Sequence, residues 1–313
     1  MSAEPNQRVD DMTMSKTPNV GSKELFIGID GGGTKCRARL FSADNKVLGT
    51  GVGGPSNPLH GELQAKDSIL TAVNMAVADA NLSASAVNDV IAGIGLAGVN
   101  LPSMFDVMNA WHHPFKKMYL TTDLHIACLG AHSGADGAVI IAGTGSCGYS
   151  FVNGKATILG GHGFPFGDKG SGAWFGLEAI KAVLLASDNL GPQTCLSDLI
   201  GNHLNAKGVM IVDKMGAAKS SDYAQLARFV LEAAELKDEV ALKIISEGAD
   251  YINALAEMLW ATGANRMSLI GGLSDALLPC LKPSVATSLS SPINQPEYGA
   301  VYFAQQQHAL AHT

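Results

Sequence analysis

The chain has 313 residues, 47% hydrophobic and 16% charged, a balance typical of a well-packed soluble protein long enough for two domains. Its formal net charge of −7 argues against a nucleic-acid partner, and no apolar run approaches the roughly 20 residues that cross a membrane. The five scattered cysteines form no C-x-x-C pair and no zinc ribbon, so we expect reduced, buried thiols in a cytoplasmic protein.

The first predicted feature is a polar segment, followed by a strand that ends in glycines. Residues 1–23 lack the apolar core of a signal peptide and are interpreted as a disordered tail. The apolar run 25–29 predicts a buried strand that leads into Asp30, three glycines and Thr34. Successive glycines remove side chains where bare N–H groups can touch a phosphate, and an Asp at a strand end can hold Mg²⁺ through water. Strands at 36–41 and 46–49 then form a hairpin meander, with no helix after the glycines.

The next elements place two polar residues in loops. Asn57 lies between two prolines, and by itself it is equally a simple turn residue. Helical spacing of apolar residues predicts a helix over 62–80, and strands follow at 90–96 and 117–120. Asp123 stands between the second of these strands and a helix over 124–130. It is either the helix N-cap or a ligand-binding group at the carboxyl edge of a sheet.

The opening pattern then repeats. A strand at 138–142 leads into the glycine loop 143–148, and strands at 149–152 and 155–159 flank a hairpin turn at Asn153-Gly154. Strand, glycine turn with a hydroxyl, strand, turn and strand thus occur twice. The sequence therefore indicates an internal duplication.

The remainder of the chain is predicted to be mainly helical. A glycine-dense connection over 160–172 enters a helix, helical segments with polar breaks fill 191–238, and a long amphipathic helix covers 240–262. A strand at 266–270 ends in Gly271-Gly272, after which a helix begins, so a ligand there would meet a helix N-terminus. Residues 284–296 are expected to contain loop and strand, and 298–310 a terminal helix.

Three types of nucleotide site compete for these glycines. Residues 143–148 match G-x-G-x-x-G, but a dinucleotide fold needs a helix directly afterwards, and this chain continues into a hairpin. The P-loop string is absent. Two glycine hairpins and a third Gly-Gly turn remain, an arrangement that clasps phosphates between two similar lobes.

The motifs 30–34, 122–123, 143–146, 167–171 and 271–272 together resemble the sugar kinase, hsp70 and actin superfamily. Within it, they are most similar to the BadF/BadG/BcrA/BcrD-type branch, which contains N-acetylglucosamine and glucosamine kinases. The resemblance implies an α/β fold of two actin-like (ribonuclease H-like) lobes with a duplicated core and an interlobe cleft. The first lobe would comprise 24–134 with 297–313, and the second 135–296.

The resemblance also implies roles for individual residues. Asp123 would be the catalytic base, and Asp30 would hold Mg²⁺ through water. The ATP-binding residues would be Gly31, Gly32, Gly33, Thr34, Lys35, Gly143, Thr144, Gly145, Gly271, Gly272 and Ser274. The sugar-binding residues would be Asn57, Asp123, Gly161, His162, Gly163 and Asp168, with His162 standing where the animal kinases carry an aromatic residue.

The implied activity is MgATP-dependent phosphorylation of the 6-hydroxyl of N-acetylglucosamine by a homodimer whose partners are small molecules. Glucosamine as the sugar remains an alternative. A second alternative is an ATPase that activates a radical dehydratase and holds an iron–sulfur cluster, with Cys128 and Cys147 as candidate ligands. A third is a sugar-sensing regulator without catalysis. Because the cysteine motif of zinc-binding sugar kinases is absent, and the thiols are equally those of a core, we expect neither zinc nor an iron–sulfur cluster.

Overall fold

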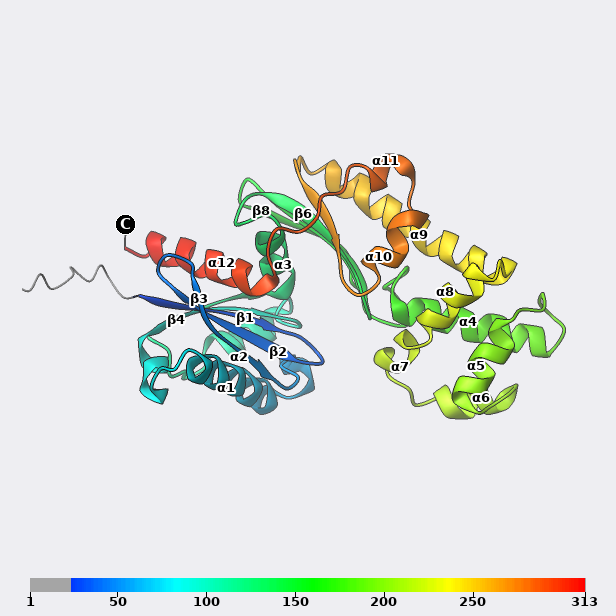
Figure 1. The fold of residues 1–313 in the computed structure, drawn as a ribbon, viewed down its shortest axis with the longest axis horizontal. Coiled ribbons are helices and arrows are strands. Elements are labelled where there is room, and N and C mark those ends of the chain that lie inside the picture. Colours follow the sequence, from blue (N-terminus) through cyan, green and yellow to red (C-terminus); the bar gives the residue numbers. More distant parts are fainter. Residues whose placement is uncertain (1–23, 313) are drawn as a thin grey trace, which may run out of the picture.

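The computed structural model describes residues 24–312, so the tail predicted at 1–23 lies outside the described residues (Figure 1). Its first half contains a sheet with the strand order β3-β2-β1-β4-β5. The strands are β1 (Leu25–Gly31), β2 (Cys36–Ser42), β3 (Val47–Gly53), β4 (Val90–Leu96) and β5 (Lys117–Thr122). β1, β2 and β3 are antiparallel neighbours, whereas β4 and β5 run parallel to β1.

The two faces of this sheet are covered by helices from distant parts of the chain. On one face, Ile27 and Ile29 pack against α1 (Glu62–Asp79), near the short helices η1 (Pro58–His60), η2 (Ala84–Asp89) and α2 (Pro102–Asn109). On the other, Phe26 packs against the terminal helix α12 (Pro296–Leu310). Figure 1 shows α12, drawn in red, beside the blue strands. The lobe boundaries at 134 and 297 stay a prediction.

The second half repeats the first sheet. β6 (Gly137–Ala142), β7 (Ser146–Val152), β8 (Lys155–Gly160) and β9 (Met267–Ile270) form a sheet in the order β8-β7-β6-β9. β6 pairs antiparallel with β7 and parallel with β9. In the first sheet, β1 pairs in the same way with β2 and β4. Asn153 and Gly154 have φ values of 50° and 75°, the left-handed turn that a two-residue hairpin requires. The predicted duplicated α/β fold is confirmed.

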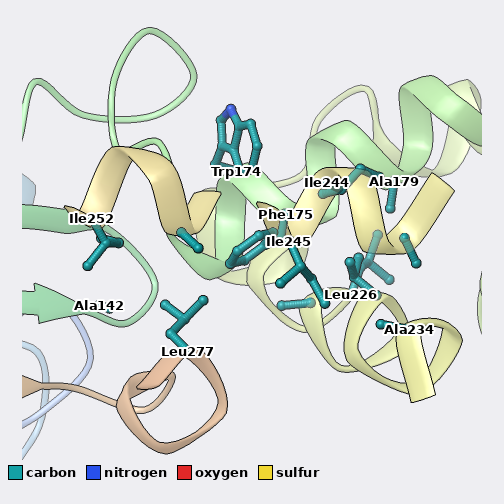
Figure 2. Close-up of a cluster of buried hydrophobic side chains, with 14 of the residues drawn as sticks. Ala142, Trp174, Phe175, Ala179, Leu226, Ala234, Ile244, Ile245, Ile252 and Leu277 are labelled. Carbon is teal, nitrogen blue, oxygen red and sulfur yellow. The ribbon is translucent and has the colours of Figure 1, made fainter. Parts of the chain in front are cut away.

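The helices of the second half pack on the second sheet and on one another, and together they form the larger core. The longest are α4 (Gly172–Ser187) and α9 (Glu239–Trp260). The shorter ones are α5 (Leu196–Leu204), α6 (Val209–Met215), α7 (Ser220–Ala224), α8 (Ala227–Glu235), α10 (Ser274–Leu277), η3 (Leu278–Cys280) and α11 (Pro283–Ala286). Figure 2 shows Phe175 of α4 against Ile245 of α9, and Leu277 directed from α10 toward the same cluster. This packing fixes the turn before α10 onto the sheet.

Helix α3 (Asp123–Ala131) lies between the two sheets and against α12. Its residues from His125 to Ala131 are all buried, which explains its strongly apolar composition. Two glycines allow the crossing. A Cβ at Gly299 would lie 1.9 Å from the Ile126 carbonyl oxygen, and a Cβ at Gly130 would lie 2.5 Å from that of Gln295. The start of α3 is therefore held at the junction of both halves.

Two expectations are wrong. Residues 284–296 contain α11 and irregular backbone but no strand. Pro292 and Pro296 lack the N–H that a sheet ladder needs, and within 284–296 only the Ser290 N–H donates to β9. The cysteines are all free, but only Cys36, Cys128 and Cys147 are buried, whereas Cys195 is half-buried and Cys280 is exposed. Among the described helices, none combines the length and apolar content required to span a bilayer.

Candidate active site

Two aspartates meet at the carboxyl edge of the first sheet. Asp30, near the end of β1, is in register with Gly95 of β4 and, across it, with Thr121 of β5. Asp123 follows β5 by one residue. Both carboxylates line one cavity of about 780 Å³. The predicted residues that share this cavity are Asp30, Lys35, Asp123, Gly271, Gly272 and Ser274.

Asp123 is the first residue of α3 but does not cap it. The Thr122 hydroxyl accepts a hydrogen bond from the His125 N–H at 3.2 Å, so Thr122 is the N-cap. One carboxylate oxygen of Asp123, Oδ1, accepts the Leu124 N–H at 2.9 Å. Burial raises the pKa of Asp123 to about 6, although the hydrogen bond from Leu124 acts in the opposite direction. Such a carboxylate is ionised at neutral pH yet basic enough to accept a proton.

The glycine turn after Asp30 presents an open backbone. The Gly32 N–H donates to the Lys35 carbonyl at 3.0 Å, which closes the turn, and Gly33, Thr34 and Lys35 are exposed. A methyl group added at Gly33 would meet no atom within 4 Å. The glycine is therefore not required by packing, and the empty space above it is available to a ligand.

The second and third glycine turns lie side by side. Because β6 and β9 are parallel neighbours, they end at the same edge, and the Leu273 N–H donates to the Ala142 carbonyl at 3.0 Å. Gly143 and Thr144 accept hydrogen bonds from Gly172 at 2.8 Å and Ala173 at 3.2 Å, which joins this turn to the start of α4. Gly271 has a φ of 109°, a conformation that favours glycine, and the Ser274 hydroxyl donates to its carbonyl at 2.8 Å.

Asp30 lies in an unusually acidic setting. Burial, together with the Glu297 and Asp123 carboxylates, raises the pKa of Asp30 to about 7, while Arg37 and Lys35 act in the opposite direction. The described residues contain no group of three or more His, Cys, Asp or Glu side chains arranged to hold a metal. Mg²⁺ in nucleotide sites needs only one or two carboxylates besides phosphates and water, and the donor set around Asp30 fits that requirement.

The residues predicted to bind sugar come from separate regions. Asn57 caps η1, accepting the Leu59 N–H at 3.0 Å, so it has the turn role that its sequence position suggested. Asp168 accepts the Gly163 N–H at 3.2 Å, and its Oδ2 is 2.7 Å from where a Cβ on Gly145 would lie. Burial raises the pKa of Asp168. None of the sugar-binding candidates except Asp123 lines the cavity; nor do Gly31–Thr34 or Gly143–Gly145.

Sequence reasoning missed part of the cavity wall. The segment from Leu289 to Pro296 contributes Ser290, Asn294, Gln295 and Pro296, and Arg37 of β2 also lines the cavity. Glu297, which follows Pro296, is buried beside Asp30. The local signal at 296–297 is a proline followed by an acid, which marks an ordinary helix start, so its relation to Asp30 is visible only in three dimensions.

Known proteins resemble the chain over most of its length. The pattern of the BadF/BadG/BcrA/BcrD ATPase family matches residues 27–304. Glucosamine kinase GspK of Vibrio cholerae is 36% identical over 286 residues, 91% of this chain and 97% of that protein. An N-acetylmuramic acid/N-acetylglucosamine kinase of Clostridium acetobutylicum is 29% identical over 251 residues, 72% of this chain and 76% of the other.

A solved structure agrees with these relatives. A Chromobacterium violaceum protein, provisionally described as an N-acetylglucosamine kinase, superimposes with a TM-score of 0.85 and 30% identity. The superposition covers 90% of this chain and 99% of that protein.

Proposed function

The chain belongs to the BadF/BadG/BcrA/BcrD ATPase family, and from this premise we propose that it transfers the γ-phosphoryl group of ATP to the 6-hydroxyl of N-acetylglucosamine, with Asp123 as general base. That it is an amino-sugar kinase rests on its relatives, glucosamine and N-acetylglucosamine kinases that it matches over most of its length. The observation that carries the catalytic assignment is the buried Asp123 carboxylate in the cavity that also contains Asp30 and the Gly271-Gly272 turn.

The proposed base acts on the sugar hydroxyl. A hydroxyl is a poor nucleophile at neutral pH, so a carboxylate that accepts its proton during attack accelerates transfer by roughly 10²–10⁴-fold. The Leu124 N–H fixes Oδ1 of Asp123, and the other carboxylate oxygen is left for the substrate. The hydrogen bond orients the base without neutralising it.

The phosphate side is built from backbone and cations. The open turn at Gly33 and the N–H groups near Gly143 would surround the phosphates, and Lys35 brings a positive charge to the cavity. Asp30 would hold Mg²⁺ through water, and the bound ion would neutralise charge on the phosphates. The rest of the acceleration would come from positioning.

Glucosamine is the second candidate sugar, favoured by the 36% identity to the Vibrio cholerae glucosamine kinase. The two sugars differ in the substituent on one nitrogen, an ammonium or an acetamido group. An ammonium would gain from a carboxylate such as Asp168, whereas an acetamido methyl needs apolar contact. The loops that contain Asn57 and 160–170 would make this choice.

The experiment is a measurement of ADP release with MgATP and N-acetylglucosamine, glucosamine, N-acetylmannosamine or glucose, with a control that contains no sugar. We expect the highest kcat/KM with N-acetylglucosamine and a product phosphorylated at the 6-hydroxyl by NMR. A preference for glucosamine would change the proposed substrate but leave Asp123 as the proposed base. ADP release that is independent of every sugar would overturn the kinase assignment.

A further inference from the structure

Glu297 is a buried residue, and one of its carboxylate oxygens has no hydrogen-bond partner among the described residues. It is the second residue of α12, after Pro296, and only 3% of it is exposed. Its Oε2 is fully enclosed and makes no hydrogen bond within residues 24–312. Buried charged groups in folded proteins are normally paired or bind a metal, so this one requires an explanation.

Close backbone packing holds Glu297 in this position. A Cβ on Gly28 would lie 1.8 Å from the Glu297 carbonyl oxygen, and one on Gly93 would lie 1.9 Å from that of Ala300. The first turn of α12 thus rests directly on β1 and β4. Gly299 allows equally close contact with α3. Three such contacts fix the start of α12, and with it the backbone of Glu297, against the sheet and α3.

The same packing directs Glu297 toward Asp30. Side chains two residues apart in a strand share a face, so Asp30 projects on the side of β1 on which α12 covers Gly28. Phe26, two residues earlier, packs on α12 in agreement with this. Gln295 and Pro296, directly before Glu297, line the same cavity as Asp30.

The available cations do not neutralise this glutamate. In the sheet, Arg37 of β2 lies opposite Asp30, and Arg39 lies opposite Gly28. Both arginines therefore project from the same face of the sheet as Asp30. Within the described part of the chain, however, neither arginine forms an ion pair with Glu297, and Arg39 stacks over the Tyr298 ring at 5.1 Å. The N-terminus of α12 offsets only part of a negative charge. Among the described residues no ion pair offsets the Glu297 carboxylate, and carboxylate oxygens are ligands that Mg²⁺ prefers.

We propose that Glu297 is a positioning residue that, with Asp30, holds the water shell of the Mg²⁺ ion that accompanies the nucleotide. This inference rests on the proposed function, because it requires a Mg-nucleotide in the cavity. Carboxylate oxygens from β1 and α12 would accept hydrogen bonds from the waters of the hydrated ion, since Mg²⁺ keeps several waters in nucleotide sites. Glu297 would thereby set where the metal lies relative to the phosphates, without touching the sugar.

The test is the affinity for a non-hydrolysable ATP analogue, measured by calorimetry in Mg²⁺ and in EDTA for the wild type and Glu297→Gln. We expect Mg²⁺ to strengthen binding to the wild type, and Glu297→Gln to lose at least about tenfold of that gain. Its affinity in EDTA and its unfolding temperature should be unchanged, since the replaced oxygen has no partner. Glu239→Gln, a substitution in the exposed first turn of α9, should behave as the wild type.

The inference would be overturned if Mg²⁺ strengthened binding of the analogue to Glu297→Gln as much as to the wild type. It would also be overturned if Mg²⁺ did not strengthen binding to the wild type. If the variant does not fold, a crystal structure of the wild type with the analogue and Mg²⁺ decides. Metal-bound waters that contact Glu297 support the proposal, and a Glu297 paired with Arg39 overturns it. These experiments contain no sugar, so failure to phosphorylate any amino sugar would count against the proposed function alone.

Discussion

At the residue scale, the chemistry proposed for Asp123 depends on one hydroxyl beside it. Because the Thr122 hydroxyl caps α3, the Asp123 carboxylate is not needed as the N-cap, and Asp123 lines the cavity. Burial then raises its pKa, since desolvation disfavours the charged form. A lone Asp between a strand and a helix does not reveal this division of roles, which requires the observed hydrogen bonds.

The pH dependence of catalysis should report this pKa. The base acts only when ionised, so we expect kcat/KM to fall tenfold per pH unit below about pH 6, the pKa of Asp123. An unperturbed Asp would place this limb near pH 4. A pH–rate profile with the preferred sugar measures it, and a limb at pH 4 would contradict the burial argument.

The matched variant is Asp123→Asn, which keeps the shape and the hydrogen bond from Leu124. It should lose about 10²–10⁴-fold in kcat while the affinity for MgATP is retained. The pKa of Asp123 is higher in the folded protein than in the unfolded chain. The stabilisation that protonation of Asp123 gives the folded state is therefore fully present below pH 4 and is lost as the pH rises through about 6. The variant should therefore unfold no earlier than the wild type at pH 8. Retention of more than about a tenth of the activity would exclude a general-base role.

At the element scale, glycines serve two different purposes in β1 and the turn after it. Gly28 is required by packing, because the backbone of α12 occupies the place of its Cβ. A Cβ added at Gly33 would meet no atom within 4 Å, so packing does not require this glycine, in agreement with its proposed role in binding a ligand. The sequence shows both simply as glycines.

A pair of substitutions separates these purposes. Gly28→Ala should destabilise the protein by about 3 kcal/mol or more, because a methyl group 1.8 Å from the Glu297 carbonyl forces α12 off the sheet. Gly33→Ala should leave the free energy of unfolding within about 0.5 kcal/mol of the wild type but raise KM for ATP at least tenfold. Urea denaturation and initial rates measure both. An unchanged KM in Gly33→Ala would remove this turn from the phosphate site.

At the scale of the whole molecule, the proposed sugar residues belong to opposite halves. Asn57 precedes η1 beside the first sheet, whereas Asp168 lies against Gly145 at the edge of the second. They do not share the cavity that contains Asp123. A sugar that contacts all three would lie between the two halves, and we expect the halves to approach each other around it, which would also exclude water from the phosphoryl group.

Small-angle X-ray scattering should detect this approach. We expect the radius of gyration to decrease when the preferred amino sugar is added, and to decrease further with a non-hydrolysable ATP analogue. A sugar that is not turned over is the control and should leave it unchanged. An unchanged radius with the preferred sugar at saturation would contradict this closure.

Much of the architecture follows from local patterns. Apolar runs, glycine turns and the Asn153-Gly154 hairpin specify the strands and the duplication, because alternation and turn chemistry are encoded within a few residues. The resemblance of the short motifs to a known family supplied the roles of Asp30 and Asp123. Local pattern failed at 284–296, where prolines outweigh strand propensity, and at α2, which is not among the predicted elements.

The sequence by itself thus determined the two repeated sheets, the glycine turns and the candidate base. Only the tertiary structure decided that Thr122 and not Asp123 caps α3, that 289–296 walls the cavity, and that Glu297 is buried beside Asp30. The reason is physical. Glu297 is 267 positions from Asp30, and contacts between such distant residues arise from how helices pack on sheets, which no local period encodes.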